Sequence, residues 1–166
     1  MHLKAARQPL LRGESMKEFF IFITSNIAFD AAFLSWFIAQ VIKMIITLVT
    51  EKTFDIRKFM NSGGMPSSHS AFVAALAICI AFKDGFASTQ FALAAALACV
   101  VMYDAAGVRR AAGEQAKVLN KMMDAWEDME PEFMQMQLKE ILGHTPAQVG
   151  AGAVLGIVIA LIFMLA

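Results

Sequence analysis

The segment GGMPSSHSA, residues 63–71, joins two glycines and a proline to a cluster of serine and histidine, and an apolar run follows it directly. Hydrophobic residues make up 58% of the 166-residue chain and charged residues 17%, which is far from the composition of a typical soluble domain. An apolar run of about 17 residues or more can cross a bilayer as a helix. The polar cluster therefore stands where a membrane helix is predicted to begin.

Further apolar runs predict an all-α integral membrane bundle that forms one domain over residues 1–166. Membrane helices are predicted at residues 31–50, 66–82, 86–106 and 146–166. A weaker apolar run at residues 19–29 brings the predicted number of spans to five, with Asp30 joining it to the next span. Residues 1–16 are predicted to be a flexible segment, and no A-x-A cleavage site suggests a removable signal peptide.

Residues 107–145 form a polar insertion between the last two predicted spans. The run RRAAGEQAKVLNKMMDAWEDM predicts an amphipathic helix, and a second helix is expected between Pro131 and Gly143. Methionines cluster in this insertion. They suit packing against the bundle or the membrane surface, and the alternative is a lid that contacts the chain of a substrate.

The positions of lysine and arginine predict the orientation of the bundle. With five spans, all but two of the 14 basic residues share a side with residues 51–65 and 107–145. The exceptions are Lys43, inside a span, and Lys83. The basic side is expected to face the cytoplasm of a bacterial inner membrane or an equivalent organelle membrane.

Two general features exclude some functions. The formal net charge is zero, which gives no reason to expect a nucleic-acid partner. Cys79 and Cys99 lie inside apolar runs without a metal-ligand spacing, so they are expected to be small core residues, and no metal site is predicted.

The start of the predicted helix at Pro66 has the chemistry of an anion site. Proline suits the first helical position, and Ser67, Ser68 and His69 then fall in the first turn, whose amide groups lack helical acceptors. The helix dipole is positive there and attracts phosphate. Gly64 allows the backbone to turn closely beside this end. The alternative is an ordinary capped helix start.

A second helix start has the same character. Thr145 suits the N-cap and Pro146 the first helical position, so His144 directly precedes another membrane helix on the same predicted side as His69. A lone histidine is usually structural, but two in this shared setting point to a common site.

Three cations are candidates for binding an anion at this side. Lys43 lies deep in an apolar span, one turn after Gln40, where an ammonium group is expected to face a polar cavity rather than reach the span's end. Arg109 and Arg110 suit bidentate phosphate binding. The alternative is that these arginines anchor the membrane edge, with Asp104 as their ion-pair partner.

The stretches GGMPSSHSA, VMYDAAGVRRAAGEQAKVLN and LKEILGHTPAQVGAGAVLG together resemble the divergent branch of the type 2 phosphatidic acid phosphatases. These are small membrane proteins related to acid phosphatases and vanadium-dependent haloperoxidases. The resemblance covers nearly the whole chain after about residue 20, and it implies the helical core of that superfamily.

The resemblance also implies roles for residues of this chain. The PSGH motif of the superfamily corresponds to PSSH here, which makes His69 the general acid for the leaving group. His144 would be the nucleophile, and Gln148 occupies the position of the aspartate that orients it.

The same resemblance implies a phosphate-binding set. Lys43 could stand for the lysine of the first motif, and Arg109 or Arg110 for the phosphate-binding arginine. Ser67, Ser68 and Gly64, which belong to the helix start described above, complete the set. Ser68 replaces the glycine of PSGH, and no Ser-Arg pair precedes His144.

The expected function is a metal-independent phosphatase that acts on a membrane lipid phosphate or diphosphate through a phosphohistidine intermediate. No cofactor is expected, and vanadate, a mimic of the phosphoryl transition state, should bind the same pocket. The alternative is a catalytically inactive membrane protein that binds phospholipid headgroups or a protein partner. Small-residue runs such as ALAAALA permit close helix packing within one copy or between copies.

Overall fold

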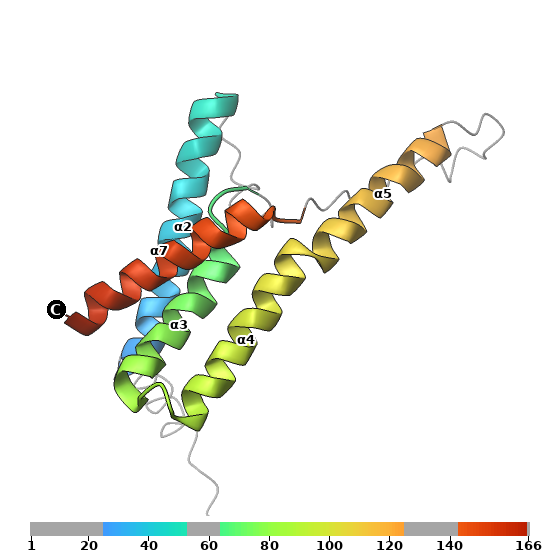
Figure 1. The fold of residues 1–166 in the computed structure, drawn as a ribbon. Coiled ribbons are helices and arrows are strands. Elements are labelled where there is room, and N and C mark those ends of the chain that lie inside the picture. The colour runs from blue at the N-terminus through green and yellow to red at the C-terminus, as the bar shows by residue number, and fades with distance from the viewer. Residues whose placement is uncertain (1–24, 53–63, 125–142, 166) are drawn as a thin grey trace, which may run out of the picture.

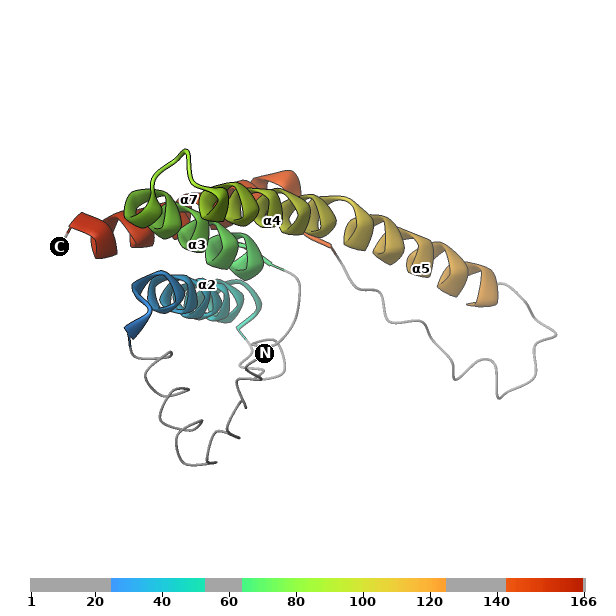
Figure 2. The ribbon, with the colours of Figure 1, turned by 90° about the horizontal axis from the view of Figure 1, so that it is seen from below.

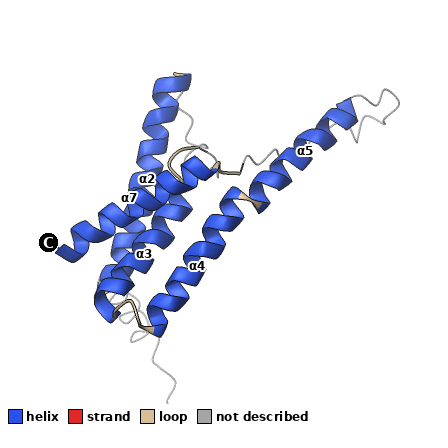
Figure 3. Cartoon of the chain, viewed as in Figure 1, coloured by secondary structure: helices blue, strands red, loops and turns tan. Residues whose placement is uncertain are grey.

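The computed structural model describes residues 25–52, 64–124 and 143–165, and these residues form helices and no strands (Figures 1 and 3). The helices are α2 (Ile27–Glu51), α3 (Ser68–Asp84), α4 (Thr89–Ala106), α5 (Val108–Asp124) and α7 (Pro146–Leu165). The predicted all-α class is thereby confirmed. The predicted segment 1–16, most of the weaker span at 19–29, and the second helix of the insertion lie outside the described residues.

Three helices in the described part of the chain are long and apolar enough to cross a membrane. They are Ile27–Thr50, the joined helices α4 and α5 over Thr89–Met123, and Pro146–Leu165. Helix α3, with 17 residues, is shorter and packs among the others. The predicted number of five spans is therefore not confirmed.

Helix α2 begins earlier than the sequence predicted. The side chain of Asn26 accepts a hydrogen bond from the backbone N–H of Phe29 at 3.2 Å, which satisfies an otherwise unpaired amide of the first turn. Asp30 therefore lies in the first turn of α2 and does not form a joint between two spans.

Helix α3 begins later than predicted, because Ser67 is its N-cap and not part of its first turn. The Ser67 hydroxyl accepts a hydrogen bond from the Ser70 amide at 3.4 Å. Pro66 consequently precedes the cap, and the prediction that it is the first helical residue was wrong. Helix α7 does begin with its proline, Pro146, as predicted.

Glycines allow α7 to lie directly on α3. A Cβ added to Gly152 would collide with the backbone carbonyl of Ser67, and one added to Gly156 would collide with that of Ala71. Glycines four residues apart lie on one helix face, and they let two backbones approach in a membrane bundle. A step of four residues along α7 corresponds to a step of four residues along α3 in the same direction. The two helices are therefore parallel, and their N-terminal ends lie together.

The rest of the core is built from small residues where α2 crosses α3. Ala28 and Ala31 of α2 pack with Ala75 and Cys79 of α3. Residues near the start of α2 thus meet the later part of α3, so the two helices are antiparallel. Figure 2 shows α2 as a separate layer next to α3.

The two cysteines have different environments. Cys79 is a buried core residue, as predicted, but Cys99 is exposed on α4. Only one face of α4 is covered, at Ala94, Ala98 and Ala105. The expectation that Cys99 is a core residue was therefore wrong, because it lies outside this narrow face.

We expect Gly156→Ala to lower the thermal unfolding temperature of the protein, purified in detergent and followed by circular dichroism. The added methyl group collides with a backbone carbonyl, and such overpacking costs about 1–3 kcal/mol. Gly150→Ala is the matched control on the same helix, because a Cβ there has no atom within 4 Å. Equal unfolding temperatures for the two variants would contradict the close packing of α3 and α7.

Candidate functional site

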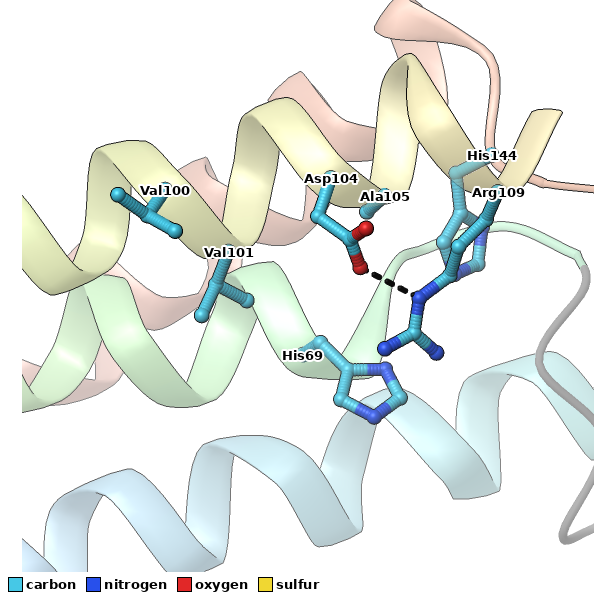
Figure 4. Close-up of a pocket in the computed structure, with 7 residues that line it drawn as sticks. All are labelled: His69, Val100, Val101, Asp104, Ala105, Arg109 and His144. Carbon is cyan, nitrogen blue, oxygen red and sulfur yellow. Dashed lines mark hydrogen bonds and ion pairs between the residues drawn. The ribbon is translucent and has the colours of Figure 1, made fainter. Parts of the chain in front are cut away.

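A cavity of about 240 Å³ lies where the start of α3 meets the end of α4 and the segment before α7. Both histidines singled out in the sequence line it, together with an arginine and an aspartate (Figure 4). The lining residues are His69, Val100, Val101, Asp104, Ala105, Arg109 and His144. Side chains from three distant stretches of the chain thus meet at one place.

The position of His144 depends on a break between α4 and α5. Gly107 ends α4, and its amide bonds to the carbonyl of Tyr103 at 2.8 Å. At this break the Ala105 carbonyl accepts a hydrogen bond from the His144 backbone N–H at 3.0 Å. Gly143 packs so closely on the backbone of Arg110 that a Cβ would collide with it. The segment before α7 is therefore fixed against the end of α4.

Gln148 connects this histidine to the start of α7. Its side-chain oxygen accepts a hydrogen bond from the Thr145 amide at 3.0 Å, and the Thr145 hydroxyl accepts one from the Gln148 amide at 3.3 Å. This reciprocal pair is a capping box. The same side-chain oxygen lies 3.4 Å from Nδ1 of His144. A proton on Nδ1 satisfies this contact.

Burial lowers the pKa of His144 below its ordinary value. The hydrogen bond to Gln148 and one to the Gly64 backbone favour the protonated ring, whereas the charges of Lys43 and His69 oppose it. Burial is the largest cause, and His144 as a whole residue is only 3% exposed. The shift therefore favours the neutral ring, the form that a nucleophilic imidazole requires.

Of the two candidate arginines, only Arg109 lines the cavity. Its Nε lies 2.6 Å from Oδ2 of Asp104, and Figure 4 shows the end of the guanidinium group pointing toward His69. The ion pair occupies Nε, so the outer nitrogens can face an anion in the cavity. Arg110 is exposed and does not line this cavity. The ion-pair role considered for Asp104 is therefore observed, with Arg109 as its partner.

Lys43 approaches the two histidines from α2. Its side chain is only 6% exposed, so it does not extend to the surface. A Cβ on Gly64 would lie 3.2 Å from Cγ of Lys43, and Gly64 has a φ of +92°, a conformation that favours glycine. The charge of Lys43 acts on both His69 and His144. Gly64 thus provides the space that this lysine occupies.

Ser67 and Ser68 are buried and line neither this cavity nor the neighbouring pocket. The hydroxyl of Ser67 interacts with Ser70, and its amide donates to the carbonyl of Gln148 at 3.0 Å. Ser67 therefore joins the starts of α3 and α7. In this sequence segment, the side chain that faces the cavity is that of His69.

A second pocket lies beside the first and was not predicted from the sequence. It has a volume of about 310 Å³ and is lined by Phe33, Trp36, His69, Phe72, Val73 and Val101. The spacing of two aromatic residues three apart on α2 was a signal that they share a helix face. Nothing in the sequence indicated that this face borders His69.

Sequence reasoning also predicted no metal site. Within residues 25–52, 64–124 and 143–165, no three histidine, cysteine, aspartate or glutamate side chains gather in a way that could hold a metal ion. The polar groups of the cavity are two imidazoles, a guanidinium group and a carboxylate. This set suits an anion held by cationic and hydrogen-bonding groups.

Comparison with known proteins supports the family resemblance of the sequence motifs. The profile of the divergent PAP2 family matches residues 24–159, which include every candidate site residue. The chain is 41% identical over 134 residues to the uncharacterized membrane protein YuiD of Bacillus subtilis (strain 168), covering 75% of this chain and 85% of that protein. No solved structure matches the chain. The protein is therefore a membrane protein that belongs to the divergent PAP2 family.

Proposed function

We propose that this protein is a metal-independent phosphatase that hydrolyses a membrane lipid phosphate or diphosphate through a phosphohistidine intermediate. The observation that carries the proposal is the single cavity in which His69, His144 and Arg109 meet. A nucleophile, a proton donor and an anion-binding group are the three parts that this reaction needs.

In the first step, Nε2 of His144 attacks phosphorus and forms a P–N bond. The bond between phosphorus and the leaving oxygen breaks, and protonated His69 donates its proton to that oxygen. In the second step, neutral His69 takes a proton from water as the water oxygen attacks phosphorus. The P–N bond breaks, inorganic phosphate is released, and both histidines return to their starting forms.

Positive groups would stabilise the charge that builds on the phosphoryl oxygens. The outer nitrogens of Arg109 offer bidentate hydrogen bonds, and Asp104 orients the group through Nε. Lys43 adds a second positive charge close to both histidines. Groups fixed in advance need little rearrangement during the reaction, which makes them effective in the transition state.

The proposed setting is the cytoplasmic edge of the bacterial inner membrane or an equivalent organelle membrane. The excess of lysine and arginine in the segments 51–65 and 107–145 of the sequence supports that side. A lipid would reach the cavity sideways with its phosphate at the membrane edge. Vanadate would compete for the same cavity.

A second candidate function is binding of phospholipid headgroups without catalysis. Gln148 favours it, because a neutral amide cannot supply the negative charge that would stabilise an imidazolium ring at His144. Arg109 and Lys43 would hold a headgroup phosphate equally well in such a protein.

Replacing His144 with alanine separates the two candidates. We expect the wild-type protein, purified in detergent, to release inorganic phosphate from lipid phosphates, and His144→Ala to lower that rate by about a thousandfold or more. His2→Ala is the matched control, since His2 is the third histidine of the chain and lies outside the described residues.

Full turnover by His144→Ala would exclude the phosphohistidine mechanism. A wild-type protein that is inert on a broad lipid panel, yet binds phosphatidic acid vesicles through Arg109, would establish the binding function.

Arg109→Gln should reduce kcat/KM for a lipid phosphate by roughly 10- to 100-fold, the range for losing a hydrogen bond to a charged group. Arg110→Gln is the control on the adjacent residue, because only Arg109 lines the cavity. Arg110 contributes its backbone to the contact with Gly143, and the substitution keeps that backbone. A larger effect at Arg110 would show that the cavity is not the phosphate site.

The pH dependence of kcat/KM should report the nucleophile. His144 must be neutral to attack, and its lowered pKa keeps it neutral down to pH values below about 6.5, the ordinary pKa of histidine. Gln148→Glu keeps the capping box but places a carboxylate beside Nδ1, which raises the pKa of His144. The acid limb of the profile should therefore move to higher pH.

The exposed residue Ala147 provides the control for added charge. Ala147→Glu should leave the acid limb in place, because Ala147 is exposed and does not line the cavity. An identical shift for both variants would mean that the effect is not made through the contact with His144.

A further inference from the structure

The second pocket borders the anion cavity, which is the cavity that contains Arg109 and His144. Helix α3 stands between α2 and α4, which have little direct contact with each other. Aromatic residues of α2 and α3 and two valines line the pocket in the space between them. Phe33 is 54% exposed, so the pocket opens toward the side of the bundle. In a membrane protein this side faces lipid.

His69 and Val101 line both spaces. The anion cavity contains Arg109, Asp104 and His144, and the second pocket contains none of them. A phosphoric ester with its phosphoryl group beside His144 therefore has its leaving oxygen near His69 and its organic part in the second pocket. The imidazole stands at the boundary between the two parts of such a molecule.

The lining of the second pocket restricts what that organic part can be. Apart from the His69 imidazole and the indole N–H of Trp36, its side chains carry only hydrocarbon and aromatic groups. The rings of Phe29, Phe33 and Trp36 follow one another along α2, with centroids 6.5 and 5.6 Å apart, and Phe72 of α3 meets Phe29 edge-on. Burying the two ester groups of a diacyl lipid here would cost free energy because the lining offers few hydrogen-bond donors, whereas burying methylene groups is favourable.

We propose that the pocket lined by Phe33, Trp36 and Phe72 binds the hydrocarbon chain of a single-chain alkyl phosphate, whose chain is apolar right up to the ester oxygen. The proposal rests on the proposed phosphatase function and specifies its substrate class. A diacylglycerol phosphate fits less well, because its two ester groups lie a few bonds from the phosphate. A sugar phosphate fits least, because its hydroxyl groups would be desolvated.

The first test compares substrates in mixed micelles at a fixed mole fraction of lipid. We expect the full-length protein to hydrolyse dodecyl phosphate with a kcat/KM at least about tenfold above that for ethyl phosphate or dioleoyl phosphatidic acid. Phe33→Ala combined with Trp36→Ala should lower the value for dodecyl phosphate by about tenfold and so remove most of its advantage over ethyl phosphate.

Phe37→Ala is the matched control for these substitutions. Phe37 is 46% exposed on the same helix and does not line the pocket. It should leave the preference for dodecyl phosphate intact. Equal values of kcat/KM for the three substrates, or an equal loss for dodecyl phosphate in Phe37→Ala, would overturn the proposed chain site.

A binding measurement distinguishes failure of this proposal from failure of catalysis. The chain has two tryptophans, so Trp126→Phe leaves Trp36 as the only source of tryptophan fluorescence. An undecyl phosphate with bromine at the end of its chain should quench Trp36, and excess dodecyl phosphate should relieve the quenching.

The two readouts have separate meanings. Relievable quenching in a protein that hydrolyses no phosphate supports the chain site and overturns the phosphatase function. Phosphate release without chain preference, and without relievable quenching, supports the phosphatase and overturns the chain site. Absence of both results overturns both proposals.

Discussion

The close contact between the backbones of α3 and α7 is the constraint on which the rest of the structure depends. Gly152 and Gly156 lie against the carbonyl groups of Ser67 and Ala71, where any side chain would separate the helices. Inside a membrane, apolar burial does not drive helices together, so close packing has to do so. Because α3 and α7 are parallel, this contact brings their starting ends together, and each start carries a histidine.

Hydrogen bonds then fix the orientation of the groups at this end. The Ser67 amide binds the Gln148 carbonyl, and the His144 amide binds the Ala105 carbonyl at the end of α4. Gln148 also caps α7 and contacts the His144 ring. Structural and chemical roles therefore coincide in one residue. The amide oxygen can orient the ring, while the missing negative charge leaves the pKa of His144 under the control of burial.

His69 lies between a polar cavity and an apolar pocket. On one side lie Arg109, Asp104 and His144, and on the other lie the aromatic residues of α2 and α3. This division matches the single-chain phosphate that we propose as substrate, in which a phosphate joins directly to hydrocarbon. It also fits the edge of a membrane, where water and lipid meet over a short distance.

Much of the helical structure was determined by the sequence alone, because the length of an apolar run and the residues that flank it are local properties. The predicted runs at residues 31–50, 66–82, 86–106 and 146–166 agree with α2, α3, α4 and α7 to within a few residues at each end. Asp30 was expected to join two spans, but Asn26 caps α2 before it, so Asp30 lies inside the helix. The long motifs were enough to identify the family.

Only the tertiary structure decided which side chains share a cavity. It selected Arg109 over Arg110, paired Arg109 with Asp104, buried the hydroxyl of Ser67, and placed the aromatic pocket beside His69. The physical reason is that helices such as α3 and α7 are apolar around most of their circumference, so the sequence pattern does not indicate which face turns inward. Contacts between residues far apart in the chain fix that rotation.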